Sequence, residues 1–140
     1  MRELAKCVAD YVEQLRGSDS ENAYHSLIEA DDAVVPLLIK AFRATRDTSV
    51  RADLVDIIWQ HRIPTTVDFL SEALDDPASQ VWQAALDGLV SMGGESAVRA
   101  LELARKQARS GDETEQERAE WIEEAIGQIT ERSAGQGIGD

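Results

Sequence analysis

The residue types that most often carry catalysis or bind metals are sparse in this sequence. Its two histidines, His25 and His61, and its one cysteine, Cys7, lie far apart and lack the spacing of a metal-binding cluster. Two pairs of adjacent aspartates, at 31–32 and 75–76, lack the pattern of a calcium loop and are expected in helix turns and caps. Paired carboxylates act as acid and base only where a closed pocket separates their pKa values. The sequence therefore predicts a protein that is not an enzyme, with no catalytic residue, metal site or cofactor.

The carboxylates are informative because they greatly outnumber the basic residues. The chain has 27 acidic residues against 14 basic ones, which gives a net charge of −13 at pH 7. Basic contacts to phosphate dominate nucleic-acid binding, so this charge disfavours DNA and RNA, and it disfavours anionic membrane surfaces for the same reason. The longest apolar run, residues 33–39, is far shorter than the ~20 residues that cross a bilayer. The charge favours solubility and, more specifically, a basic protein partner.

Apolar residues at helical spacing run along most of the chain, and strand patterns are nearly absent. Leu4, Val8, Tyr11 and Leu15 share one face of a first helix that Gly17 closes. Capping boxes, one aspartate–proline pair at 76–77 and turn residues delimit seven further helices. Their starts are expected near Ser18, Ala33, Thr48, Thr65, Asp76, Ala97 and Thr114. The sequence predicts an all-α fold of about four antiparallel helix pairs.

The apolar positions of these helices repeat. On the first helices of two successive pairs, the matched residues are Val35 with Val67, Leu38 with Leu70, and Phe42 with Leu74, an offset of 67 − 35 = 32. On the second helices, they are Val50 with Val81, Leu54 with Ala85, and Ile58 with Leu89, an offset of 81 − 50 = 31. A period in this range is typical of a stacked-repeat solenoid, in which each unit buries its apolar face against its neighbours.

One unit carries a family resemblance. Residues 74–93 resemble a HEAT repeat of the short bacterial type that is also found in phycobilin lyases: the Asp76-Pro77 turn, the core positions from Val81 to Leu89 and the closing Gly93 match that pattern. The preceding unit keeps the family's Val50-Arg51 pair but has no proline in its turn, and the last unit has six extra residues. The resemblance covers residues 33–129. It implies an α-solenoid in which the second helix of each pair lines the concave face.

The same alignment places three carboxylates at one repeat position. Asp56, Asp87 (56 + 31) and Glu124 (87 + 37) are equivalent on three successive second helices. Packed helices lie roughly 8 to 10 Å apart, so these side chains are expected to form a row. The Debye length at physiological salt is about 8 Å, so salt screens the repulsion between neighbouring carboxylates only in part. Such a row is either a solvated charged face or a binding surface, in which case a cationic partner would offset the repulsion between the carboxylates.

Further candidates lie beside this row. Gln83 and Glu120 come one turn earlier in the repeat register, and Trp59 follows Asp56 by three residues. Tryptophan beside carboxylates is typical of an interface anchor, although Trp59 would alternatively pack against the loop at residues 62–63. The predicted partner-binding residues are Asp56, Asp87, Glu124, Trp59, Gln83 and Glu120.

Two functions of different classes follow. The first is a non-catalytic protein–protein interaction module that binds a basic protein through an acidic groove. By analogy with small acidic bacterial proteins, its specific form would be an inhibitor or immunity protein against a toxin with a basic active site. The alternative, which the resemblance suggests, is a phycobilin-lyase-like or other assembly factor. Few basic groups are available near the groove to hold the propionates of a tetrapyrrole. A fragment of a larger regulator is a third possibility.

The remaining expectations concern boundaries and compartment. Residues 1–132 are expected to form one solenoid domain and residues 133–140, with three glycines, a disordered tail. The insertion at 110–116 is either a surface loop or an acidic extension of the groove. Trp82 and Trp121 are expected to pack in the core or between repeats, and Cys7 to be buried. A single cysteine fits a cytoplasmic protein, and polar outer faces on the terminal helices favour a monomer.

Overall fold

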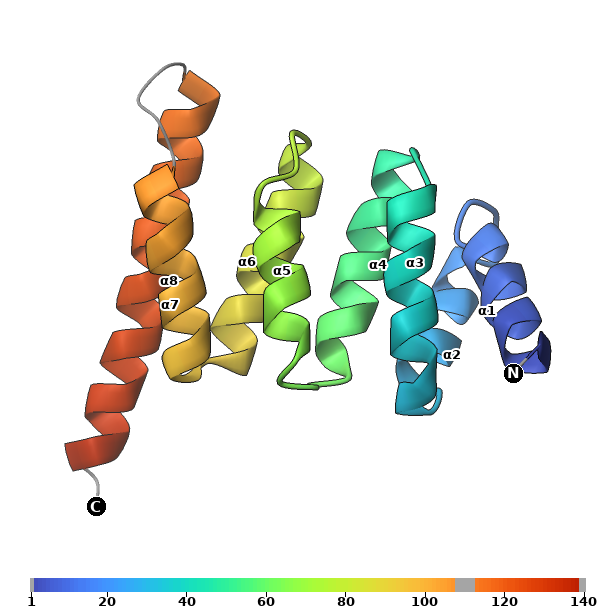
Figure 1. Ribbon diagram of the computed structural model, residues 1–140, viewed down its shortest axis with the longest axis horizontal. Helices are drawn as coiled ribbons and strands as arrows, with labels where there is room; N and C mark the ends of the chain where they lie inside the picture. Colours follow the sequence, from blue (N-terminus) through green and yellow to red (C-terminus); the bar gives the residue numbers. More distant parts are fainter. Residues whose placement is uncertain (1, 108–112, 139–140) are drawn as a thin grey trace.

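The computed structural model describes residues 2–107 and 113–138, and every regular element within these ranges is helical. The elements are α1 (Arg2–Gln14), α2 (Ser20–Glu29), the short 3-10 helix η1 (Asp32–Val34), α3 (Val35–Ala44), α4 (Thr48–Gln60), α5 (Thr66–Leu74), α6 (Ser79–Met92), α7 (Gly94–Gln107) and α8 (Glu113–Ile138). Figure 1 shows them as a row of antiparallel pairs, with the two ends of the chain at opposite ends of the row. The first helices of the pairs form one layer and the second helices the other. The predicted α-solenoid is confirmed.

The core lies between the two layers and follows the repeat. On the second helices, Leu54 and Ile58 of α4 and Ala85 and Leu89 of α6 are fully buried. The equivalent residue of α8 at the first of these positions, Ile122, is also buried. Each helix therefore presents its apolar stripe to the next unit, and the stacked units share one continuous core.

Some helix starts agree with the prediction. Pro36 lies in the first turn of α3, where its missing N–H removes no helical hydrogen bond. Asp47 caps α4, because its side chain accepts a hydrogen bond from the Val50 backbone N–H at 3.2 Å. Gly93 ends α6 with a φ of 65°, a conformation that glycine adopts without steric cost.

Other starts are wrong by a few residues. Asp76 was expected as the N-cap of α6, but that helix begins at Ser79. The Asp76 carboxylate instead accepts hydrogen bonds from the backbone N–H of Ala78 and the guanidinium of Arg51. Asp19, the residue before α2, and Thr65, the residue before α5, make no side-chain cap hydrogen bond. The capping box predicted at Thr65 is therefore absent, and α2 begins later than the predicted Ser18. Helix α7 begins at Gly94, three residues before the expected Ala97.

Two arginines fix the turns between the layers. Arg51 of α4 contacts the ring of Phe42, with 4.2 Å from its Cζ to the ring centroid, while it bonds Asp76 in the next unit. Arg118 of α8 donates to the backbone carbonyls of Leu74 and Asp76 at 3.1 and 3.0 Å. The Arg118 bonds satisfy carbonyls at and just beyond the end of α5, and the two arginines join the α5–α6 pair to the pairs on either side of it.

The two ends of the chain differ from expectation. Helix α8 continues to Ile138, whereas the sequence predicted a disordered tail from Ser133; once a helix has formed, adding residues to it costs little. Residues 139–140 and residues 108–112, which include the first three positions of the predicted insertion at 110–116, lie outside the described ranges. The remaining positions of the insertion, 113–116, begin α8. Cys7 is exposed rather than buried, because the buried stripe of α1 passes through the adjacent Val8.

Candidate functional site

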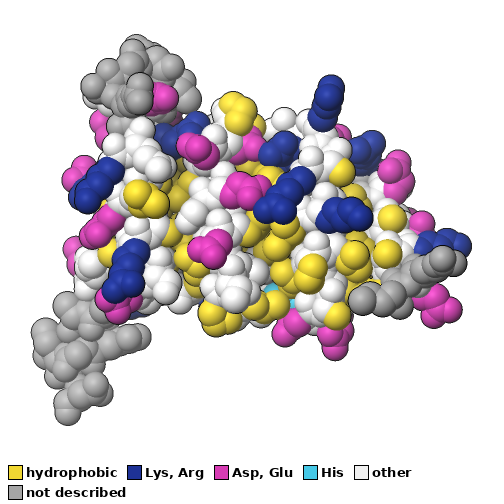
Figure 2. Space-filling view, in the orientation of Figure 1, with side chains coloured by type: hydrophobic (Ala, Val, Ile, Leu, Met, Phe, Trp, Pro, Cys, Tyr) yellow, Lys and Arg dark blue, Asp and Glu magenta, His cyan; other side chains and the backbone are white. Residues whose placement is uncertain are grey.

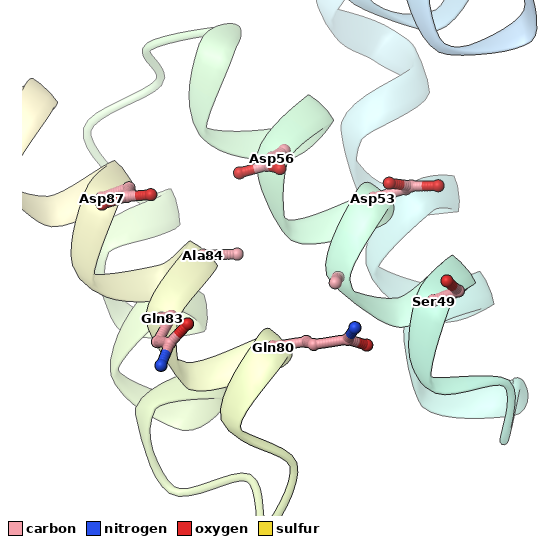
Figure 3. A pocket seen from close by; sticks show the side chains of 8 residues that line it. Ser49, Asp53, Asp56, Gln80, Gln83, Ala84 and Asp87 are labelled. Carbon is pink, nitrogen blue, oxygen red and sulfur yellow. The ribbon is translucent and has the colours of Figure 1, made fainter. Parts of the chain in front are cut away.

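A hollow of about 300 Å³ lies between the second helices α4 and α6. Four residues of each helix line it, and they are polar apart from two alanines: Ser49, Ala52, Asp53 and Asp56 from α4, and Gln80, Gln83, Ala84 and Asp87 from α6. Figure 3 shows Asp56 and Asp87 directed toward each other from the two helices, and Gln80 extending toward α4. The equivalent positions of successive repeats therefore face one another across the hollow.

The carboxylates of this hollow are partly desolvated. Burial raises the pKa of Asp56 above its ordinary value of 3.8; a hydrogen bond from Trp59 opposes this rise, and the charges of Asp87 and Asp53 add to it. Burial also raises the pKa of Asp87 and, together with the charge of Asp47, the pKa of Asp53. Each charged form is less favourable here than in water, since desolvation and like charges both oppose ionisation.

Trp59 of α4 lies beside this hollow and packs against α6. Its indole Nε1 donates to Asp56 at 3.3 Å, and its ring lies so close to Gly88 of α6 that a Cβ built on that glycine would be 2.7 Å from the ring. The guanidinium of Arg62 lies 5.8 Å from the ring centroid, so the expected packing against the loop at residues 62–63 also occurs. Trp59 is thus half-buried between two repeats, where it orients Asp56.

A second hollow, of about 190 Å³, lies between α6 and α8. Its lining combines an apolar floor, an aromatic side chain and two carboxylates: Leu86, Asp87, Val90, Trp121, Glu124, Ala125 and Gln128. Asp87 therefore borders both hollows. The predicted order of Asp56, Asp87 and Glu124 along three successive helices corresponds to two adjoining hollows that share their middle carboxylate.

The six predicted site residues do not all meet. Asp56, Asp87 and Gln83 line the α4/α6 hollow, and Asp87 and Glu124 line the α6/α8 hollow. Glu120 is exposed and lines neither, and Trp59 lies beside the first hollow without lining it. The lining residues that the prediction missed include Asp53, Gln80 and Trp121. Asp53 and Trp121 share one repeat position with Ala84 (53 + 31 = 84; 84 + 37 = 121), so the alignment itself contained a signal for them.

The charges on the two layers are arranged differently. Neither hollow has a lysine or arginine among its lining residues in the described part of the chain. On the layer of first helices, Arg43 pairs with Glu72 at 2.8 Å and Arg99 with Glu95 at 2.8 Å. Figure 2, which views that layer, shows basic and acidic side chains interspersed with hydrophobic ones. The acidic excess of the hollows is therefore a property of the second helices that line them.

Other titratable groups have structural contacts. His61 is buried at the end of α4, where Nδ1 lies 2.9 Å from the Asp32 carboxylate and Nε2 lies 2.9 Å from the carbonyl of Leu27. These contacts join α4 to the end of α2 and the start of η1. Among the residues with described positions, no group of three or more histidine, cysteine, aspartate or glutamate side chains is arranged to hold a metal ion. None of the described helices combines the length and apolarity needed to cross a membrane.

Comparison with known proteins agrees with this architecture. A family model described as HEAT repeats matches residues 35–127, which is 93 of the 140 residues. A comparison with curated proteins gave no match. The matched region runs from the start of α3 to Gly127 within α8, and it includes every residue that lines the two hollows except Gln128. HEAT repeats commonly serve as non-enzymatic interaction scaffolds. With the helix pairs, the repeated core positions and the family model in agreement, this chain belongs to the HEAT-repeat proteins.

Proposed function

We propose that this chain is a non-catalytic protein-interaction module whose second-helix face binds a basic segment of another protein. The proposal rests on one observation: Asp56, Asp87 and Glu124 follow one another along two adjoining hollows. In the part of the chain that the structure describes, no lysine or arginine lines either hollow. Concave surfaces of stacked repeats are extended enough to hold a segment of a partner chain. The charge of these hollows supports a cationic partner.

Energetics supports a cationic partner. The raised pKa values of Asp56 and Asp87 mean that their negative charges are partly desolvated in the free protein, at a cost to its stability. A bound cation reverses this cost, because it stabilises the charged forms that burial and like charges disfavour. The same surface disfavours a tetrapyrrole, since its propionates would meet carboxylates rather than basic groups.

In its specific form, the proposal is that the module acts as a monomer in the cytoplasm and masks a basic surface of a toxin, as an inhibitor or immunity protein does. The net charge of −13 steers a cationic partner toward the chain, which accelerates association and makes its rate sensitive to salt. Masking requires a fast encounter before the partner acts, and electrostatic steering supplies it.

The test is affinity capture from a lysate of the source organism, followed by identification and titration of each captured protein. Wild type is compared with a variant that carries Asp56→Lys, Asp87→Lys and Glu124→Lys. The matched control carries Glu3→Lys, Asp68→Lys and Glu102→Lys, all exposed positions on first helices. Both variants change the net charge from −13 to −13 + 6 = −7, so they differ only in where the charge is reversed.

The expected result is a basic protein that wild type and the control variant retain and the second-helix variant loses. Circular dichroism and thermal melting of all three proteins establish that each is folded. Equal retention by both variants would overturn the proposal, because binding would then follow net charge rather than the hollows. An association rate unchanged between low and high salt would remove the steering argument.

A further inference from the structure

The α6/α8 hollow contains an exposed aromatic side chain that the row of carboxylates does not explain. Trp121, in the third turn of α8, is 42% exposed. It is held in position from below by the fully buried Trp82 of α6, whose ring meets it edge to face at a centroid distance of 5.8 Å and an angle of 87°. Trp82 is in turn covered by the guanidinium of Arg118, 5.3 Å from its ring centroid. The indole of Trp121 is thus a fixed wall of the hollow.

We propose that this hollow binds one arginine side chain of the partner, an inference that rests on the proposed function and adds a specific subsite to it. Leu86, Val90 and Ala125 give an apolar floor for the aliphatic part of such a side chain. Asp87 and Glu124, one on each helix, provide carboxylates for the guanidinium. One face of the planar guanidinium stacks on the exposed indole of Trp121, and its N–H groups, which lie in the plane of the guanidinium, donate hydrogen bonds to the carboxylates.

The chemistry of the lining selects arginine over lysine. An ammonium is a compact and strongly hydrated charge, whereas a guanidinium is planar, weakly hydrated and suited to stacking on an aromatic face. The volume of about 190 Å³ holds a single side chain, and it is smaller than the roughly 300–1,000 Å³ of pockets for drug-sized ligands. A second copy of this chain is disfavoured as the occupant, because each copy carries a net charge of −13 and the rim of the hollow is acidic.

Three short peptides test the subsite directly. They are acetyl-Gly-Ala-X-Ala-Gly-amide, where X is arginine, lysine or citrulline, the last being a neutral analogue of arginine with nearly the same shape. Each is titrated into isotope-labelled full-length protein, with the indole N–H signals of the three tryptophans and the backbone signals of α4, α6 and α8 followed by NMR. The arginine peptide is expected to shift the Trp121 indole, Asp87 and Glu124, and to bind about three- to tenfold more tightly than the lysine peptide. The citrulline peptide is expected to cause no shift, because it has no charge to pair with the carboxylates.

Two variants separate stacking from charge. Trp121→Leu keeps an apolar side chain over Trp82 and is expected to weaken the arginine peptide about three- to tenfold, with a smaller effect on the lysine peptide. Glu124→Gln keeps the shape of the hollow and is expected to weaken both peptides. The matched control is Leu103→Ala, which truncates the other large exposed hydrophobic side chain of the described chain, at 56% exposure on α7, and is expected to change neither affinity.

The outcomes distinguish this inference from the proposed function. If the arginine peptide shifts only Asp53 and Asp56, and Trp121→Leu binds it as wild type does, the subsite is wrong while the basic partner remains supported. If no peptide binds at either hollow, both ideas fail. If sedimentation shows a wild-type dimer that Trp121→Leu converts to a monomer, the occupant is a second copy and the arginine subsite is overturned.

Discussion

The two hollows on the second-helix face share Asp87 and differ in what surrounds it. Between α4 and α6, that carboxylate faces Asp56 across a lining of polar side chains and alanines, and the pKa values of the aspartates there are raised by burial. Between α6 and α8, the same residue borders an apolar floor and the exposed ring of Trp121. Adjoining second helices therefore form a polar hollow and a hollow with an exposed aromatic side chain, side by side.

One repeat position contributes to this difference. Its occupants on the three second helices are Asp53, Ala84 and Trp121. In the α4/α6 hollow this position supplies Asp53 and Ala84, and in the α6/α8 hollow it supplies Trp121. The apolar residues Leu86, Val90 and Ala125 of the second hollow occupy repeat positions that do not line the first, so the two hollows also differ in register. Neighbouring units of one solenoid therefore form hollows of different chemistry.

The largest effect on this comparison is expected from Gly88→Ala. The added Cβ would lie 2.7 Å from the Trp59 ring, so the ring must move and its hydrogen bond to Asp56 must break. Overpacking costs about 1–3 kcal/mol, and the better helix propensity of alanine returns up to about 1 kcal/mol. We therefore expect a net loss of about 1–2 kcal/mol in the free energy of unfolding, measured by urea denaturation. The NMR shifts should be concentrated on the α4/α6 hollow.

Gly127→Ala in α8 is the matched control. A Cβ there has no atom within 4 Å, so only helix propensity acts, and the variant is expected to gain about 0.5–1 kcal/mol. Equal changes in stability for the two variants would contradict the close contact between Trp59 and Gly88. The α6/α8 hollow should remain unaltered in Gly88→Ala, so this variant changes one hollow without changing the other.

A smaller effect is expected from Asp56→Asn, which retains an oxygen that accepts the Trp59 hydrogen bond and removes the charge. Because the folded-state pKa of Asp56 is raised, the stability contributed by protonating this carboxyl is fully present below the ordinary value of 3.8 and is lost as pH rises through the raised value. The variant should therefore be more stable than wild type at neutral pH. The expected gain is at most roughly 0.5 kcal/mol, since the site is open to solvent and screened.

The measurement is the difference in unfolding free energy between variant and wild type from pH 7 down to below 3.8. The charge-dependent gain should vanish at the acidic end, where wild-type Asp56 is also neutral. A gain that persists unchanged over the whole range would show that it does not come from the charge. Binding of a basic partner should respond in the opposite direction and weaken as these carboxyls are protonated.

The sequence predicted the fold well because the fold depends on periodicity. The repeated core positions from Val35 to Leu89 are sufficient to place α3 to α6, and the capping role of Asp47 follows from local chemistry. The start of α6 was not predictable in this way, because Asp76 is engaged by Arg51, a residue 25 positions earlier in the chain. Local capping rules fail where a distant side chain takes the capping residue.

For the candidate site, the sequence predicted only which residues are equivalent on successive second helices. The alignment placed Asp56, Asp87 and Glu124 on successive helices, and these three residues line the two hollows. It could not show that Glu120 would lie outside them, since the rotation of a helix about its axis is set by packing. The exposure of Trp121 depends on its edge contact with Trp82, from another repeat, and no local pattern encodes that contact.

The central claim is that the two hollows form one binding surface through Asp87, and the most direct test is the dissociation constant of the captured basic partner for Asp56→Asn, Asp87→Asn and Glu124→Gln. These neutral substitutions keep side-chain shape and remove one charge each. The account predicts that Asp87→Asn weakens binding most, by about tenfold, because this carboxylate borders both subsites, while the other two variants lose about threefold. Equal losses in all three variants, or no loss in Asp87→Asn, would contradict it.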